Sequence, residues 1–298
     1  MTDAEADWLA THFEQRRPRL HAVAYRMLGS LTEADDAVQE TWIRLSRSEV
    51  GAIDNLDAWL TTVVGRVCLN LLRSRRTVHE NPGWNYVPDP LVGPADDGTD
   101  NPEEHVLLAD AVGLALLVVL ETLSPTERVA FVLHDMFAVP FDEIAPMIEC
   151  TPAATRQLAS RARRRVAGAG AVVGDHDLDL PAQRQIVEAF LRAARQGDFE
   201  GLLTLLDPDV VLRADAGAGR GSLLEGVEAV VPPVMHFMRL AQTERHLVVN
   251  GSAGLQPMRD GSPMAVMSFT FRGGTITHIT ALADPDRLHQ LGLDVVNG

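Results

Sequence analysis

Arginine is the residue whose placement first suggests chemistry, because all 26 basic residues of this 298-residue chain are arginine. Several of them gather between Thr151 and Val166, in a stretch that contains no acid. Guanidinium and carboxamide groups on one helix face can bond guanine and adenine in the major groove of DNA. Thr151-Pro152 is a typical helix start. We therefore predict a DNA-reading helix with these outward residues: Ala153, Arg156, Gln157, Ser160, Arg161 and Arg164.

A shorter apolar pattern precedes this helix and completes a predicted helix-turn-helix from Phe141 to Val166. The apolar residues recur at helical spacing, and a short turn separates them from the next helix, as major-groove reading requires. The alternative is a plain helical hairpin with a solvated basic face. The buried edge of the first helix is predicted to consist of Phe141, Ile144, Ala145 and Ile148.

Several details of this motif can be predicted. Pro146 should kink the first helix, and Glu149, where a glycine is usual, should forgo a left-handed cap. The three arginines at 163–165 are expected to grip phosphates. The inner stripe of the second helix is predicted to be Ala154, Leu158, Ala162 and Val166.

Charge divides the chain, although its net value of −15 would by itself argue against nucleic acid. The stretch Thr77–Ser124 is acidic and contains no arginine, which is typical of a solvated connector. Cys68 and Cys150 lack the spacing of a disulfide framework or a metal site, so no metal or cofactor is expected. The N-terminus does not resemble a signal peptide. The longest apolar run, Ala111–Leu120, is far below the roughly 20 residues of a membrane span, so we expect a cytoplasmic protein without a membrane partner.

The N-terminal part shows a helix with two different faces. Thr32 and Asp35 resemble a capping box at its start. One side of this helix should be buried in the core, because it carries the apolar residues Ala34, Ala37, Val38, Trp42 and Leu45. The opposite face suits a protein partner, although from the residues alone a solvated surface is the commoner explanation. This face carries Asp36, Gln39, Glu40 and Ile43.

Another helix follows the polar loop Ser46–Asn55. Its buried stripe should hold Leu56, Trp59, Leu60, Val63, Val67 and Leu71. Its other side offers arginine and a short polar group to a phosphate backbone, and the loop before it is free to touch something else. These candidate DNA-contact residues are Thr62, Arg66, Arg73 and Arg76.

Residues 79–102 are rich in Pro, Gly, Asp and Asn, so we predict a linker without regular structure. Trp84, Tyr86 and Leu91 are unusual for a pure spacer and favour docking on a neighbouring surface. Beyond the glycine-rich break at Gly168–Gly174 the pattern changes. Helices are predicted at 182–196, 198–206 and 227–240, and strands at 210–213, 245–250, 264–272 and 275–282, with a hairpin turn at 272–275. This order indicates an α+β domain.

The stretch LSPTERVAFVLHDMFAVPFDEIAPMIECTPAATRQLASRARRRV resembles region 4 of the extracytoplasmic-function sigma factors of bacterial RNA polymerase, the module that reads the minus-35 promoter element. AYRMLGSLTEADDAVQETWIRL is similar to the segment that docks on the polymerase clamp, and DNLDAWLTTVVGRVCLNLLRSRR to the part of region 2 that melts and captures the minus-10 element. The resemblance implies region 2 at 1–77, a linker at 78–102, region 4 at 103–168 and a further domain at 175–298. It also implies that the loop 46–55 holds a flipped base.

The resemblance assigns partners to the faces predicted above. It implies core RNA polymerase, bound through its β′ clamp and β flap, and promoter DNA. The polymerase contact would be the acidic face around Asp36 and Glu40, the minus-10 contacts would lie around Arg66, and the minus-35 contacts around Arg156. On this basis the chain would be no enzyme.

The last domain resembles the cone-shaped SnoaL-like or NTF2-like fold carried by a SigJ-like subgroup of these factors. That subgroup has a linker motif and a glycine loop that this chain matches in degenerate form, and Asn250-Gly251 and Asp284–Leu288 look like its later signatures. The resemblance implies that the domain modulates the sigma factor in cis and encloses a pocket for a possible small molecule. The linker and regulatory residues would be Tyr86, Pro88, Asp89, Pro90, Asp215, Gly217, Gly219 and Arg220.

Two other functions stay open at this point. One is a one-component transcription regulator that binds duplex DNA alone and senses a small molecule through the cone domain. The other is an isomerase or hydrolase that moves a proton with Asp215, His236 or His278. A lone histidine on a strand is more often structural, and no second acid or base is spaced beside it.

Overall fold

The computed structural model describes residues 3–48, 53–78, 86–94, 113–168, 178–217 and 219–293. The chain forms two compact units, one made of residues 1–80 with 119–170 and the other of residues 81–118 with 171–298. The linker segment 86–94 therefore belongs to the same unit as the C-terminal domain. None of the helices within these ranges is long and apolar enough to cross a membrane.

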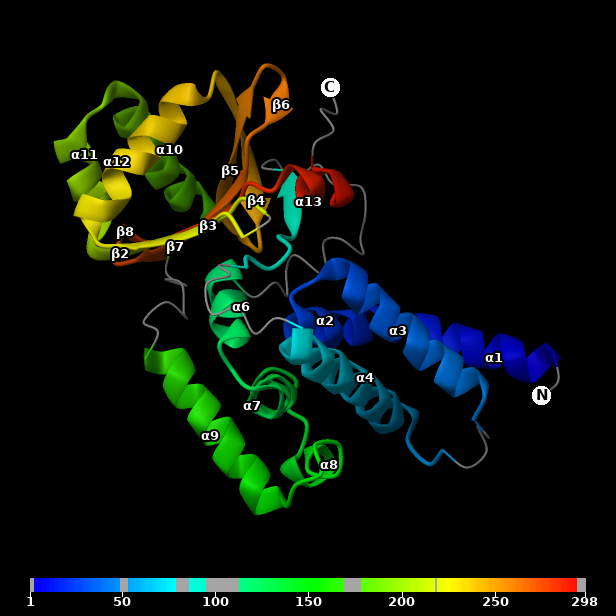
Figure 1. The fold of residues 1–298 in the computed structure, drawn as a ribbon. Helices are drawn as coiled ribbons and strands as arrows, with labels where there is room; N and C mark the ends of the chain where they lie inside the picture. Colours follow the sequence, from blue (N-terminus) through cyan, green and yellow to red (C-terminus); the bar gives the residue numbers. More distant parts are fainter. Residues whose placement is uncertain are drawn as a thin grey trace. The chain divides into compact units, whose positions relative to one another are not determined.

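Four helices open the first unit: α1 (Asp3–Glu14), α2 (Arg17–Leu28), α3 (Leu31–Ser46) and α4 (Leu56–Val78). Figure 1 shows them as the blue and cyan part of the chain. The helix predicted from Thr32 begins earlier, because Ser30 caps α3 by accepting a hydrogen bond from the amide of Glu33. Gly29, with φ of 66°, ends α2 immediately before this cap, so α2 and α3 form a tight antiparallel pair.

The core of this bundle agrees in part with the predicted stripes. On α3, Ala34, Ala37, Val38 and Leu45 are buried, whereas Trp42 is only half-buried. On α4 the buried side chains differ in part from the predicted stripe, because the helix packs against α2, α3 and a later helix of the same unit instead of one neighbour. They are Leu60, Thr61, Val64, Val67, Cys68, Leu69 and Leu72.

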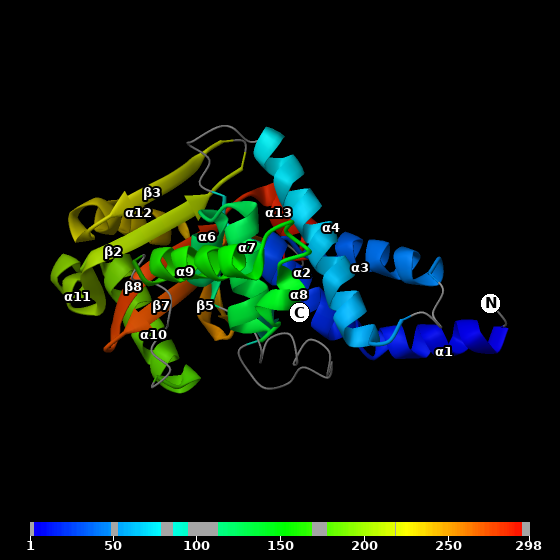
Figure 2. The ribbon, with the colours of Figure 1, turned by 90° about the horizontal axis from the view of Figure 1, so that it is seen from below.

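Next along the chain is α6 (Leu114–Glu121), which spans the boundary between the two units at residues 118 and 119. The rest of the first unit comprises α7 (Pro125–Phe131), a π-helical turn η2 (Val132–Met136), α8 (Phe141–Ile144) and α9 (Pro152–Gly168). Ser124 and Glu127 form a reciprocal capping box at the start of α7. α7 packs against both α9 and α4, which Figure 2 shows from below.

The helix-turn-helix differs from its prediction in three ways. Pro146 does not kink the first helix, which instead ends at Ile144 because proline cannot continue the hydrogen bonding. Glu149 does adopt the left-handed conformation, with φ of 58°. The inner stripe of α9 is shifted toward the C-terminus at two positions, since the buried residues are Thr155, Ala159, Ala162 and Val166.

The second unit is built on one curved sheet. Its strands are β1 (Val92–Pro94), β2 (Leu206–Asp215), β3 (Gly221–Glu225), β4 (Thr243–Val249), β5 (Ser252–Arg259), β6 (Ser262–Pro263), β7 (Val266–Arg272) and β8 (Thr275–Leu282). The strand order is β1-β4-β5-β7-β8-β2-β3, and β6 pairs with β5. β2 runs parallel to β8, and the other neighbours are antiparallel.

Helices α10 (Leu180–Gln196), α11 (Phe199–Leu205) and α12 (Val227–Leu240) gather on one side of this sheet, and α13 (Pro285–Gln290) follows the last strand (Figure 1). Phe190 from α10 packs edge-on against Phe269 of β7 within a single apolar core. This is the predicted α+β cone fold. The predicted hairpin turn is present, with Gly273 and Gly274 at φ of 57° and 82°. The prediction missed β1, β3, β5 and β6.

Candidate functional site

The predicted protein-contact face lies on the outer side of α3. Asp36 and Gln39 are exposed, and Glu40 and Ile43 are partly exposed beside them. Glu40 forms an ion pair with Arg44 one turn later, with a distance of 2.9 Å between Oε1 and Nε. The face is therefore acidic with an apolar residue among the charges, a surface that complements a basic partner.

The residues predicted to contact DNA from α4 differ in their surroundings. Arg73 is exposed, and the side chain of Arg76 lies outside the described residues. Thr62 is half-buried and donates its hydroxyl to the carbonyl of Ala58 at 2.8 Å. Arg66 is exposed and reaches the carbonyl oxygen of Pro146 at 3.4 Å, so one candidate DNA contact is directed at the helix-turn-helix.

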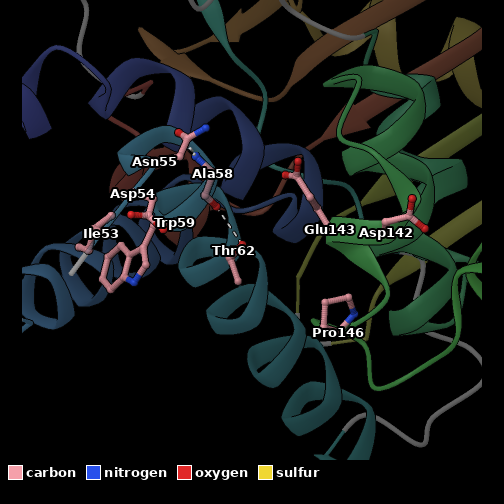
Figure 3. A pocket seen from close by; sticks show the side chains of 9 residues that line it. All are labelled: Ile53, Asp54, Asn55, Ala58, Trp59, Thr62, Asp142, Glu143 and Pro146. Carbon is pink, nitrogen blue, oxygen red and sulfur yellow. Dashed lines mark hydrogen bonds between the residues drawn. The ribbon is translucent and has the colours of Figure 1, made fainter.

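A cleft of about 430 Å³ opens next to Thr62, between α4 and the helix-turn-helix (Figure 3). The helix-turn-helix contributes Asp142, Glu143 and Pro146. Asn55 caps α4 by accepting a hydrogen bond from the amide of Ala58, which fixes the corner of the cleft. The other wall is formed by α4 and the loop before it, through Ile53, Asp54, Asn55, Ala58, Trp59 and Thr62.

The outer face of α9 presents its predicted side chains to solvent. Arg156 lies over the ring of Phe141, with 5.7 Å between the guanidinium carbon and the ring centroid, which connects the two helices of the motif. All six predicted residues are exposed: Ala153, Arg156, Gln157, Ser160, Arg161 and Arg164.

Two arginines expected to grip phosphates form ion pairs within the protein. Arg163 pairs with Asp135, and Arg165 Nη1 lies 2.8 Å from Glu127 Oε2. Burial raises the pKa of Glu127, but its hydrogen bonds from Ser124 and the nearby arginines outweigh this and hold the pKa below its usual value. Both ion pairs tie α9 to the preceding helices, so they orient the reading helix whether or not they also meet DNA.

The linker docks on the C-terminal domain as an added strand. β1 pairs antiparallel with β4, with Val92 opposite Val249. At its start, the amide of Leu91 donates to the side-chain oxygen of Asn250 at 3.0 Å, and the amide of Asn250 donates to the carbonyl of Leu91 at 2.8 Å. Asn250 is buried and takes a left-handed backbone with φ of 50°. Strand addition gives the linker a fixed register.

A charged cluster holds the preceding linker residues. Arg287 Nη2 donates to the carbonyl of Val87 at 2.8 Å and to the carboxylate of Asp89, while its Nη1 lies 2.8 Å from Asp215 Oδ2. The guanidinium also lies over the ring of Tyr86, 4.6 Å from its centroid. Burial lowers the pKa of Arg287, but Tyr86 and the two carboxylates outweigh it and raise the pKa, so this arginine stays charged.

Asp215 uses both carboxylate oxygens in this cluster. Its Oδ2 accepts from the amide of Val87 at 3.2 Å, and its Oδ1 accepts from the amide of Gly217 at 3.0 Å. Gly217 has φ of 72°, and a β-carbon there would lie 2.4 Å from Asp284 Oδ2, so only glycine fits this turn. The loop is therefore shaped to aim Asp215 at the linker.

The structure thus brings together some of the predicted linker and regulatory residues. Tyr86, Asp89 and Asp215 meet at one point, and Pro88 and Pro90 are buried beside them in the chain. Gly219 and Arg220 are exposed further along the loop, and Trp84 lies outside the described residues.

Arg287 and Asn250 were absent from the predicted set, although both stand in segments that resemble the subgroup's later signatures. Two buried carboxylates call for a counterion, but Asp89 and Asp215 meet only in the folded chain, so no local signal in the sequence pointed to Arg287.

The candidates for proton transfer lie apart. His278 on β8 stands opposite Val211 on β2, four residues from Asp215, a separation of about 13 Å along the strand. His236 is exposed on α12. Burial, aided by nearby arginines, lowers the pKa of His278. Within the described ranges, no three His, Cys, Asp or Glu side chains gather as metal ligands.

Comparisons with known proteins agree with this arrangement. Residues 12–78 match the family model Sigma-70 region 2, and residues 113–166 match Sigma-70, region 4. The sigma factor SigJ of Mycobacterium tuberculosis is 36% identical over 93% of this chain and 92% of its own length. The chain belongs to the extracytoplasmic-function sigma factors of RNA polymerase. The probable sigma factor SigI of the same organism is 33% identical over 99% of this chain and all of its own length.

A crystal structure of SigJ superimposes on this sigma factor with a TM-score of 0.75 and 33% identity, covering 94% of this chain and 98% of that one. The likeness extends through the C-terminal SnoaL-like domain, so the cone fold is part of the shared architecture. As a sigma factor, the chain binds core RNA polymerase and promoter DNA, and it catalyses no reaction of its own. The comparison favours this function over a DNA-binding regulator that works without polymerase.

Proposed function

We propose that this sigma factor brings core RNA polymerase to promoters that it reads at two elements, with its C-terminal domain modulating the outcome in cis. The observation that carries the second part is the linker between the two DNA modules, which is held by Asp215, Asn250 and Arg287 of the C-terminal domain. A linker held in this way restricts how far the two modules can separate.

The individual contacts follow from the exposed faces. The outer face of α3 would meet the polymerase β′ clamp, and region 4 would meet the β flap. The exposed arginine side of α4 would follow the minus-10 strand, the loop before α4 would hold a flipped base, and the outer face of α9 would read the minus-35 element. A small-molecule ligand of the C-terminal domain stays a prediction. The protein would act in the cytoplasm, where RNA polymerase works.

Run-off transcription with core polymerase tests promoter reading. The full chain should give a promoter-dependent transcript, and Arg156→Ala should reduce it about 5- to 150-fold, because a well-placed side chain contributes about 1–3 kcal/mol of base discrimination. Arg239→Ala is the matched control, since Arg239 is an exposed arginine on α12 of the other unit. If the full chain supports no promoter-dependent transcript, the proposed function is wrong.

Modulation in cis needs its own test. Arg287→Gln weakens the grip on the linker without touching either DNA module, and it should change transcript yield from the same promoter. The chain ending at Val166, which lacks the whole domain, should change the yield in the same direction. Equal yields from all three forms would refute control in cis while leaving the sigma function intact.

A further inference from the structure

A group of three side chains lies at the junction of the helix-turn-helix with the turn before it. The imidazole ring of His134 stacks on the ring of Phe141, with 3.7 Å between the ring centroids and 27° between the ring planes. The guanidinium of Arg156 lies over the same phenylalanine ring. The three residues come from η2, α8 and α9, and α8 packs against both of the others. Figure 1 shows α8 beside the first turns of α9.

Phe141 is placed differently from the other apolar residues of its segment. The sequence predicts that it shares a buried edge with Ile144, Ala145 and Ile148, and these three residues are buried. Phe141 itself is only half-buried. Part of its ring is thus left for contacts outside the core, and the ring makes such contacts with His134 and Arg156.

The loop before α8 fixes the imidazole of His134. Nδ1 of His134 donates to the carbonyl of Val139 at 3.0 Å, since a carbonyl oxygen can only accept. The amide of Val139 in turn donates to the carbonyl of Leu133 at 2.9 Å. Between these contacts Ala138 has φ of 56°, a left-handed conformation that is unfavourable for a residue with a β-carbon. Such strain persists where the surrounding contacts enforce it, and here it accompanies the placing of the Val139 carbonyl against the imidazole.

An aromatic ring holds an arginine differently from a carboxylate. Further along α9, Arg163 and Arg165 are held by ion pairs, which engage N–H groups of their guanidinium. The guanidinium of Arg156 is attracted to the π electrons of the Phe141 ring, whose centroid is 5.7 Å away. This attraction needs none of the N–H donors with which an arginine bonds guanine. Arg156 can therefore keep its contact with the ring while it reads a base.

We propose that His134 and Phe141 are positioning residues for Arg156, and that their stack directs the guanidinium toward the major groove before DNA arrives. Ordering a long, exposed side chain during binding lowers affinity about two- to tenfold, so a side chain that is ordered beforehand discriminates better between base pairs. The inference rests on the proposed function, in which the outer face of α9 reads the minus-35 element. It adds two residues that set sequence preference through Arg156 without touching a base.

Competitive run-off transcription with core polymerase tests the positioning. The full chain transcribes two promoters together, which differ by one base pair at the minus-35 position where Arg156→Ala abolishes the preference. Phe141→Leu keeps an apolar side chain but removes the ring, so it should lower the preference for the better promoter about two- to fivefold. Phe141→Tyr keeps the ring and should keep the preference of the unsubstituted chain.

Dependence on Arg156 separates positioning from a purely structural role. In an Arg156→Ala background, Phe141→Leu should change the preference no further, because its effect passes through the guanidinium. An equal loss of preference in both backgrounds overturns the inference. Phe137→Leu is the matched control, since the half-buried ring of Phe137 lies under Arg26 of α2 and not under an arginine of α9. It should leave the preference unchanged, and an equal loss in this control also overturns the inference.

His134→Leu tests the other positioning residue and does not depend on the folding of Phe141→Leu. It removes the imidazole and its hydrogen bond to Val139, so it should lower the preference about twofold, and only while Arg156 is present. An unchanged preference in a folded His134→Leu or Phe141→Leu protein overturns the inference.

The failure of the inference can be told apart from the failure of the proposed function. If the unsubstituted chain directs transcription but Arg156→Ala alters the preference at no position, Arg156 reads no base and only the inference falls. If the unsubstituted chain gives no promoter-dependent transcript, the proposed function is wrong, and the inference falls with it.

Discussion

Replacing Arg287 with glutamine should release the linker from the C-terminal domain. The guanidinium holds two carboxylates at once, and the side chains of Asp89 and Asp215 are only 8% and 3% exposed. Glutamine keeps some of the volume and the polarity but supplies no charge, so these two carboxylates would lie close together without a counterion. Releasing the linker is the simplest way to return Asp89 to water.

The magnitude follows from the burial of this cluster. Removing one partner of a buried ion pair costs about 3–5 kcal/mol. The lower end of that range applies to docking for two reasons. The Arg287 side chain is still 17% exposed, and in the unsubstituted protein Arg287 keeps its ion pair with Asp215 when the linker is released, so docking depends only on the pair with Asp89. A loss of about 3 kcal/mol lowers the docking equilibrium constant about 100-fold, since each 1.4 kcal/mol is a factor of ten.

Hydrogen exchange measures this equilibrium directly. The amides of Val87 and Leu91 donate to Asp215 and Asn250, so their exchange should accelerate by about 100-fold in Arg287→Gln. Amides in α10 should keep their protection, because that helix belongs to the apolar core of the domain. Arg272→Gln is the matched control, an exposed arginine of the same domain. Unchanged exchange at both linker amides in a folded Arg287→Gln protein would refute the reasoning.

Three further predictions concern single positions. Gly217→Ala should lower the stability of the C-terminal domain by about 2–4 kcal/mol in thermal melts, because the added β-carbon collides with Asp284 and the backbone is left-handed. Gly219 has φ of 73° but open space around it, so Gly219→Ala should lower the stability by only about 1 kcal/mol. The pKa of Glu127 is lowered in the folded state, so its carboxylate stabilises the fold at pH values above its unfolded pKa of about 4.5, and this stabilisation is lost as the pH falls through the folded pKa. Glu127→Gln should therefore flatten the pH dependence of the free energy of unfolding in that acidic window. Arg163→Ala should lower the affinity for all promoters alike by about three- to tenfold, whereas Arg156→Ala should relax the preference for one promoter sequence. Competition between promoter variants measures both effects. A loss of sequence preference in Arg163→Ala would contradict the assignment of Arg163 to phosphates and of Arg156 to bases.

The sequence predicts elements that rest on local rules. α12 (Val227–Leu240) and β8 (Thr275–Leu282) begin and end where predicted, because their apolar periods are strong and each follows a glycine, Gly226 or Gly274. β5 was missed because it contains Gly254 and Pro257, which local propensity places in turns. In the structure it is a central strand, stabilised by pairing on both sides that no local pattern reveals.

The candidate site residues also divide into those set by local spacing and those brought together by the tertiary fold. The outward residues of α9 could be predicted, because helical spacing alone sets which side chains point away from the core. The linker cluster could be anticipated only as a tendency to dock, because its charged residues are far apart in sequence. Arg287 lies 72 residues from Asp215 and 198 residues from Asp89. Such meetings depend on the tertiary fold, which is why Arg287 had no place among the predicted residues.

The strength of linker docking decides whether it can act as a control. β1 is three residues long and adds few backbone hydrogen bonds, so the strand alone would hold the linker weakly. Arg287 makes the stronger contacts, an ion pair with Asp89 and a hydrogen bond to the carbonyl of Val87, and a hydrogen bond that involves a charged group contributes about 1.5–3 kcal/mol. Moving a two-state equilibrium from 99:1 to 1:99 takes a differential binding free energy of about 5.5 kcal/mol. If the docked linker opposes the separation of regions 2 and 4, the binding of core polymerase would have to supply that amount to release it. A docking free energy of a few kcal/mol is thus large enough to keep the linker docked in the free sigma factor and small enough for a binding partner to overcome.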